Sequence, residues 1–270
     1  METAVAFFFY SSAFLAGICL GSFATALIHR IPLGLSWICD DRGGGARSAC
    51  THCGKKLGIA DLVPLFSWLA LRGHCRYCAA PIPARYPLVE AATGLAALAM
   101  AWAWGMDWAL LPVLLAIPFM AAAIVIDWEH MILPDDINVA FSILAAAYLC
   151  LLAWGGAWEG GGAAITVLAD HIGAAFVLTL LLYGCAAVIA RWKGREALGM
   201  GDMKFLPAAG LFLGFAPLPS FLMLAGVLGV GTAFLKGGKE GDSAFPFGPA
   251  LIISLYFHLF LTGLRFDYMW

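Results

Sequence analysis

The chain has very little charge for its length. Of its 270 residues only 12% are Asp, Glu, Lys or Arg, whereas 63% are hydrophobic, and the mean hydropathy is +0.90. A soluble globular domain carries about twice that share of charge, so the composition excludes one. The net charge of −2 says little about partners, and we expect no nucleic acid among them. The sequence predicts an integral membrane protein with the lipid bilayer as its surroundings.

Several common catalytic signatures are also missing. No G-x-S-x-G elbow, H-E-x-x-H pair or P-loop occurs anywhere in the chain. These absences argue against a serine hydrolase of the elbow type, a zinc protease of the H-E-x-x-H type and a P-loop nucleotide hydrolase. Any chemistry has to come from other groups.

Long apolar stretches recur along the whole chain. Crossing a bilayer takes roughly 20 mostly apolar residues in a helix, and a cleaved signal peptide would account only for the first stretch. We therefore predict an all-α polytopic membrane protein with about eight transmembrane helices and a small polar insert. The expected spans are 5–28, 88–104, 109–126, 139–154, 164–189, 205–215, 220–235 and 247–264.

The basic residues predict an orientation. With the N-terminus outside, 14 of the 15 Lys and Arg residues fall on one side and only Arg265 falls on the other. Short cytoplasmic loops carry the positive excess in membrane proteins, so we expect that side to be cytoplasmic. The residues on it are Arg30, Arg42, Arg47, Lys55, Lys56, Arg72, Arg76, Arg85, Arg191, Lys193, Arg195, Lys204, Lys236 and Lys239.

Two cysteine pairs lie in the polar insert between the first and second spans. "CTHCGKKLG" and "GHCRYCAAPI" contain two C-x2-C pairs separated by 21 residues, a spacing typical of a four-thiolate zinc site. Two disulfides are disfavoured because cytoplasmic thiols stay reduced. We predict one structural Zn²⁺, with no open position for a catalytic water. Its expected ligands are Cys50, Cys53, Cys75 and Cys78.

Two acidic residues are placed at the same end of different spans. Asp127 ends the third span in "AIVIDWEHMILPDDIN", and Asp202 follows the fifth in "LGMGDMKFL", 75 residues later. Carboxylates beside an apolar run are functional candidates, and two that lie close together share a proton, so one can act as a base on water. We predict that Asp127 and Asp202 form a catalytic pair that hydrolyses an amide.

Residues near this pair are expected to support it. Gly199 and Gly201 would let a peptide backbone approach Asp202, and the helix expected after Asp202 would offer free amides. Lys204, Asp135 and Glu129 are the other expected supporting residues. A simpler interpretation makes the acids of these loops solvated residues or helix caps, as for Asp135 at the start of the fourth span.

The motifs together resemble those of bacterial type IV prepilin peptidases, membrane aspartic proteases of the GxGD class. The resemblance rests on "GSFATALIHRIP", the two cysteine pairs around "ADLVPLFSWLALRG", "RYPLVE", "IDWEHMILPD", "GMGDMK" and "FPFGP", in the family's order. It implies that Asp127 and Asp202 are the catalytic aspartates. It also implies that the protein lies in the bacterial inner membrane and cuts the basic leader of prepilins and pseudopilins at the cytoplasmic face.

The resemblance also implies N-methylation of the new N-terminus with S-adenosylmethionine. The chain departs from the pattern at Thr25, where the family usually has Asn, and in a shorter insert than some bifunctional relatives have. It contains no Rossmann-type methyltransferase fingerprint, and the site of the methyl donor and the oligomeric state stay open. The expected organisation is a first span at 1–29, a zinc insert at 30–87 and a peptidase core at 88–270.

Two other functions fit the same residues. In a proton-coupled carrier the two aspartates would form an ion relay, which predicts acids near the bilayer midplane and two repeated halves. The acids lie at the membrane edge and no convincing repeat is present. In a scaffold of a secretion assembly, the zinc module would bind partners and both aspartates would be dispensable.

Overall fold

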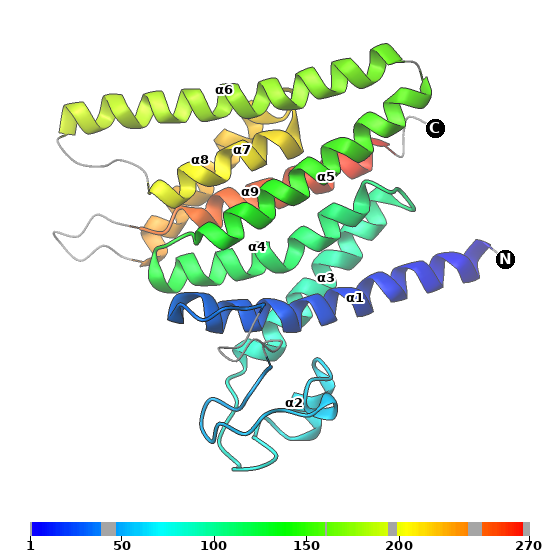
Figure 1. The fold of residues 1–270 in the computed structure, drawn as a ribbon, viewed down its shortest axis with the longest axis vertical. Coiled ribbons are helices and arrows are strands. Elements are labelled where there is room, and N and C mark those ends of the chain that lie inside the picture. Colours follow the sequence, from blue (N-terminus) through cyan, green and yellow to red (C-terminus); the bar gives the residue numbers. More distant parts are fainter. Residues whose placement is uncertain (1, 39–46, 160, 194–198, 237–244, 267–270) are drawn as a thin grey trace. The chain divides into compact units, whose positions relative to one another are not determined.

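The computed structural model describes residues 2–38, 47–159, 161–193, 199–236 and 245–266. Helices dominate this part of the chain, which contains no strand and only two isolated β-bridges. The predicted all-α class is therefore confirmed (Figure 1). The helices are α1 (Glu2–Arg30), η1 (Ile31–Leu33), η2 (Ile59–Asp61), α2 (Phe66–Ala70), α3 (Arg85–Trp104), α4 (Leu110–His130), α5 (Asp135–Glu159), α6 (Gly161–Lys193), α7 (Met200–Leu213), α8 (Leu218–Lys236) and α9 (Gly248–Phe266).

Each of the eight predicted spans overlaps one of the helices α1 and α3 to α9. By length and composition, α1, α3, α4, α5, α6 and α8 are long and apolar enough to cross a membrane. The apolar part of α9 is shorter, at Gly248–Leu264. Helix α7 has 14 residues, or about 21 Å of rise, less than the roughly 30 Å of a hydrocarbon core. The protein is thus a multi-pass membrane protein, and α7 is shorter than an ordinary membrane span.

The chain divides into two compact units. The first comprises Met1–Trp102 with Ile117–Ala122, and the second comprises Ala103–Ala116 with Ala123–Trp270. The first unit therefore contains α1, the insert, α3 up to Trp102 and the segment Ile117–Ala122 of α4. The second contains both predicted catalytic aspartates.

Small residues allow α1 and α3 of the first unit to pack closely. A Cβ on Gly17 would lie 2.6 Å from the Cβ of Ala97, and one on Gly21 would lie 2.6 Å from the Cα of Glu90. Such contacts are typical of membrane helices, whose association depends on close packing because lipid is as apolar as the helices. They place Gly21 and Glu90 at the same level along the two helices.

In the second unit α5, α6 and α7 pack against one another, and α8 packs on α9 (Figure 1). Gly210 of α7 lies against the backbone of α6, since a Cβ there would be 2.4 Å from the Cα of Ala175. Tyr148 of α5 is almost fully buried and its ring contacts those of Trp104 and Phe212. These contacts hold α5, α6 and α7 together as the core of the second unit.

Candidate active site and metal centre

Two carboxylates from distant parts of the chain lie near each other in the second unit. Asp127 lies in the last turn of α4 and Asp202 in the first turn of α7. Their residues are only 4% and 8% exposed, and each carboxylate is within electrostatic reach of the other. The structure thus brings together the two acids that the sequence pairs, at the ends of their helices.

Asp127 is held by a backbone group that the sequence analysis missed. The N–H of Gly248, the first residue of α9, donates to Asp127 Oδ2 at 2.9 Å. A Cβ on Gly248 would lie 2.8 Å from the same oxygen, so the contact requires glycine. The only sequence signal was the motif "FPFGP". Lys236 also acts electrostatically on Asp127, and its Nζ lies 5.7 Å from the centre of the Trp128 ring.

Gly201 has a different role from the one expected. A Cβ on Gly201 would lie 2.7 Å from the carbonyl oxygen of Leu133 and 2.8 Å from its Cβ, so Leu133 fills the space predicted for a substrate backbone. The buried side chain of Asn138 also donates to the Gly201 carbonyl at 3.2 Å. Gly201 therefore lets α7 pack on the "LPD" turn that follows α4.

The start of α7 also differs from the prediction. Gly199 is the N-cap residue and the helix begins at Met200, so Asp202 lies inside the first turn and not before it. A Cβ on Gly199 would lie 3.3 Å from Asp202 Oδ2. This glycine keeps the space beside the Asp202 carboxylate clear. Because Asp202 lies inside the first turn of α7, the free amides of that turn flank the aspartate itself.

Lys204 and Asp135 form an ion pair, with Lys204 Nζ 2.6 Å from Asp135 Oδ1. The pair links α7 to the first residue of α5 next to the "LPD" turn, and the supporting role of both residues stays a prediction. Both side chains are well exposed, so the ion pair contributes little to the free energy of unfolding. Its main effect is to fix the start of α7 beside the start of α5. Glu129 is exposed, with its carboxylate 4.0 Å from His130 Nε2, and its supporting role stays a prediction.

Replacing Gly201 by Ala is expected to lower any activity of the pair by about 100-fold, because a displacement of about 1 Å can cost that much. The added methyl group must push α7, with Asp202, away from Leu133. Cleavage kinetics on purified protein would measure this effect. Gly226→Ala is the matched control, since a Cβ there meets nothing within 4 Å. Equal activities of the two variants would show that the packing of Gly201 on Leu133 is unimportant.

Four thiols gather in the first unit. The Sγ atoms of Cys50, Cys53, Cys75 and Cys78 all lie within 4.8 Å of one another, and those of Cys50 and Cys78 are 3.9 Å apart. Sulfurs about 2.3 Å from a tetrahedral zinc would be roughly 3.8 Å apart. The donor set and its geometry fit Zn²⁺, as the spacing predicts.

The two cysteine pairs are built in the same way. The N–H of Gly54 donates to the Cys50 carbonyl, and that of Ala79 donates to the Cys75 carbonyl, both at 2.9 Å. Gly54 and Ala79 both have positive φ, at 68° and 56°. Each pair is therefore a tight turn that is closed by the N–H of the residue after it.

Electrostatics favour thiolate formation at one ligand and link the two pairs. Backbone N–H groups of Cys53 and His52 lower the pKa of Cys50 to about 6, which favours the metal-binding form.

An ion pair lies near the thiol cluster, in which Asp61 Oδ1 accepts a hydrogen bond from Arg76 Nε at 2.6 Å. The Gly58 N–H, followed by the Arg76 guanidinium, lowers the pKa of Asp61. This ion pair ties the segment between the cysteine pairs to the second pair.

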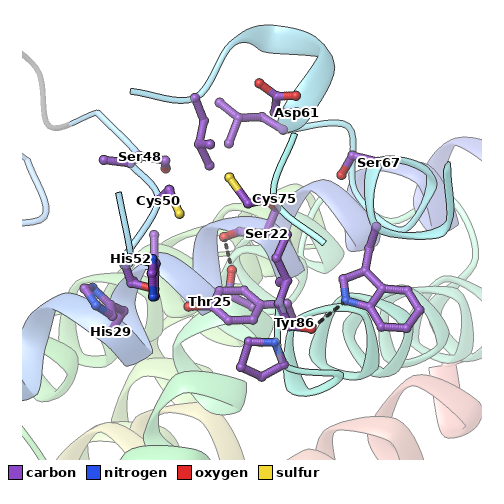
Figure 2. A pocket seen from close by; sticks show the side chains of 18 of the residues that line it. Ser22, Thr25, His29, Ser48, Cys50, His52, Asp61, Ser67, Cys75 and Tyr86 are labelled. Carbon is purple, nitrogen blue, oxygen red and sulfur yellow. Dashed lines mark hydrogen bonds between the residues drawn. The ribbon is translucent and has the colours of Figure 1, made fainter. Parts of the chain in front are cut away.

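A cavity of about 500 Å³ lies between the end of α1 and the insert (Figure 2). Ser22, Thr25 and His29 line it from α1, and Cys50 and Cys75 line it from the thiol cluster. Its remaining lining is both aromatic and polar, and includes Trp68, Tyr86, Arg30, Arg47 and Asp61. The volume falls within the roughly 300–1,000 Å³ of small-molecule sites.

The fold and these sites define a class of protein. It is a multi-pass helical membrane protein in which two buried carboxylates meet, with a four-thiolate site in a separate unit. That arrangement suits aspartic hydrolysis of a peptide bond at a membrane.

Comparison with known proteins identifies the family. Residues 15–104 match the bacterial peptidase A24 N-terminal domain, and residues 114–234 match the type IV leader peptidase family. The chain therefore belongs to the type IV leader peptidase family, and the ion-relay alternative is not favoured. No solved structure matches the chain.

Similar proteins cover nearly the whole chain. A prepilin leader peptidase/N-methyltransferase of Aeromonas hydrophila is 33% identical over 91% of this chain and 88% of its own length. Proteins with the same name from Burkholderia pseudomallei and Stutzerimonas stutzeri are 32% and 33% identical, over 88% and 91% of this chain and 81% and 88% of their own lengths.

Proposed function

We propose that this protein removes the leader from prepilins and pseudopilins, with Asp127 and Asp202 as its catalytic residues. The observation that carries the proposal is the meeting of these two buried carboxylates from α4 and α7 in a chain of the leader peptidase family. Co-expression with a candidate prepilin tests it. Loss of the leader, seen as a smaller product whose new N-terminus is identified by mass spectrometry, is the expected result.

The proposed chemistry needs one proton shared between the two acids. Asp127, whose Oδ2 already accepts the Gly248 N–H, acts as the base and takes a proton from water. The water oxygen attacks the carbonyl carbon of the scissile bond, while protonated Asp202 donates to the carbonyl oxygen. When the tetrahedral intermediate collapses, the C–N bond breaks, the leaving amine takes the proton held by Asp127, and a hydroxyl of the intermediate returns a proton to Asp202. Burial of both groups stabilises the shared-proton state because two adjacent charges are costly there.

We propose that the N-terminus lies outside the inner membrane and that the zinc insert and both aspartates face the cytoplasm. The positive excess on one side supports this orientation. Arg42, Arg195 and Lys239 of that set lie outside the described residues. The expected organisation, with a zinc insert at 30–87 and a peptidase core at 88–270, is part of the same proposal.

Labelling of single cysteines is expected to reveal this orientation. In a chain with Cys19, Cys39, Cys150 and Cys185 replaced, a cysteine at Gly162 should react with an impermeant thiol reagent added to intact spheroplasts. A cysteine at Lys193 or Lys239 should react only after the membrane is opened. The reverse pattern would place the aspartates on the wrong side for a substrate whose leader lies in the cytoplasm.

We also propose that the protein methylates the new N-terminus and that the cavity beside the thiol cluster receives S-adenosylmethionine. The names of the similar proteins suggest the activity. The lining has groups suited to each part of this molecule: Arg30 and Arg47 for its carboxylate, Asp61 for hydroxyl or ammonium groups, and the Trp68 and Tyr86 rings for the adenine. The bound molecule would supply the methyl group.

Photo-crosslinking is expected to locate the methyl donor. Ultraviolet irradiation with labelled S-adenosylmethionine should mark peptides that contain Tyr86 or residues 22–30, and Tyr86→Ala should reduce the labelling several-fold. Leu95→Ala, at an exposed position of α3 outside the cavity, is the control. Labelling confined to peptides elsewhere in the chain would rule out this cavity while leaving the peptidase proposal untouched.

A further inference from the structure

We infer that the segment 59–69 of the insert lies in the lipid boundary of the membrane and anchors the zinc module there. The segment connects the two cysteine pairs. The exposed surface of this segment would be covered by phospholipid, on the side of the membrane where α1 ends and α3 begins. The inference rests on its exposed apolar side chains, on its depth relative to α1 and α3, and on one strained contact with α3.

The segment exposes an unusual amount of apolar surface. Five of its large hydrophobic residues are exposed: Ile59 at 89%, Phe66 and Leu69 at 63%, Val63 at 43% and Leu62 at 40%. By contrast, the first cysteine pair exposes polar residues such as Thr51 and Lys56. Large exposed apolar patches on soluble surfaces are rare and mark contact with a partner or a membrane.

One hydrogen bond fixes the level of this segment along the membrane helices. The backbone N–H of Leu65 donates to Glu90 Oε2 at 2.7 Å. Glu90 lies five residues into α3, or about 8 Å along its axis, and it is level with Gly21 of α1. Gly21 in turn lies nine residues before the end of α1 at Arg30, or about 14 Å.

Both helices are candidate membrane spans, so Leu65 lies at a level inside the ends of two candidate spans. The side chain of Leu88, exposed at 67%, faces outward at a level between Arg85 and Glu90. The exposed residues around Leu65 therefore continue, at the same depth, an apolar surface that α3 already presents. Lipid chains are the surroundings expected at that depth.

The backbone of Leu65 is strained where it makes this contact, which indicates that the contact is specific. Leu65 has a φ of 61°, a value that non-glycine residues rarely adopt. Such strain persists only where surrounding contacts compensate for it. Here the compensation is the Glu90 carboxylate, which also interacts with the Ser22 side chain of α1. In lipid this carboxylate would need such donors, and the inserted segment supplies one.

A photo-crosslinking amino acid can identify what covers the segment. We would place p-benzoylphenylalanine at Phe66 and, as the matched control, at exposed Lys56 of the same insert. Membranes of cells that co-express a prepilin would be irradiated, and the adducts identified by mass spectrometry. We expect several-fold more phospholipid adduct at 66 than at 56. Zinc content verifies that both variants are folded.

The Glu90 contact provides a second, independent comparison. Glu90→Ala removes the acceptor for the Leu65 N–H and is expected to reduce the lipid adduct at 66 several-fold, whereas Glu90→Gln keeps an acceptor and most of the adduct. Adducts at 66 to the prepilin or to a second copy of this chain in place of lipid would overturn the inference. Equal lipid adduct at 66 and 56 would overturn it as well.

Discussion

Asp127→Asn and Asp202→Asn are each expected to lower the rate of leader removal by about 1,000-fold or more, while the protein remains in the membrane. An asparagine amide can neither take a proton from water nor carry the shared proton. Because both acids belong to one catalytic unit, the double variant should be scarcely worse than either single one. Co-expression with a prepilin, with quantification of processed and unprocessed chains, provides the measurement.

Two neighbouring acids are the matched controls. Glu129→Gln and Asp136→Asn each remove a carboxylate within a few residues of the same turn, and both positions are exposed. We expect each to keep most of the activity. Processing by either catalytic variant at near the parental rate would refute the assignment and would favour a scaffold in which both aspartates are dispensable.

Cys50→Ser and Cys75→Ser are expected to remove one zinc per chain and to disorder the insert. Among the described residues of the insert, only Gly73 and Cys75 are buried, so this module has almost no hydrophobic core of its own. A metal held by four thiolates supplies stability that such a small module lacks, and it leaves no position for a catalytic water. Metal analysis and limited proteolysis of the purified protein measure both effects.

The rate of cleavage by these cysteine variants distinguishes a structural zinc from a catalytic one. Loss of the ligands should weaken substrate handling, and any methylation, more than it slows the chemistry at Asp127 and Asp202. An active, folded enzyme with intact cysteines and no metal would contradict the zinc assignment. A cysteine variant that folds normally but loses cleavage as completely as Asp202→Asn would contradict the structural role.

The features predicted best were those that local sequence encodes. Helical spans follow from runs of apolar residues, and the thiol cluster follows from two C-x2-C pairs, whose turns need only a few residues each. The sequence also pairs Asp127 with Asp202, because each acid borders an apolar run at the same expected depth, and the catalytic role of the pair stays a prediction.

The contacts missed are those that depend on tertiary packing. The Gly248 amide reaches Asp127 from 121 residues away, and only the folded bundle brings the start of α9 to the end of α4. Gly201 was expected to make room for a substrate, whereas it makes room for Leu133. A glycine indicates that another group comes close to the backbone, but the sequence does not identify that group.

The pH dependence of cleavage tests the central claim most directly. Purified protein in nanodiscs would be given a prepilin, and initial rates of leader release would be measured across the pH range in which the protein stays folded. Two carboxylates that share one proton predict a bell-shaped profile, with activity lost when both are protonated and again when both are ionised. A rate that rises to a plateau with pH, as one base alone would give, would contradict the account.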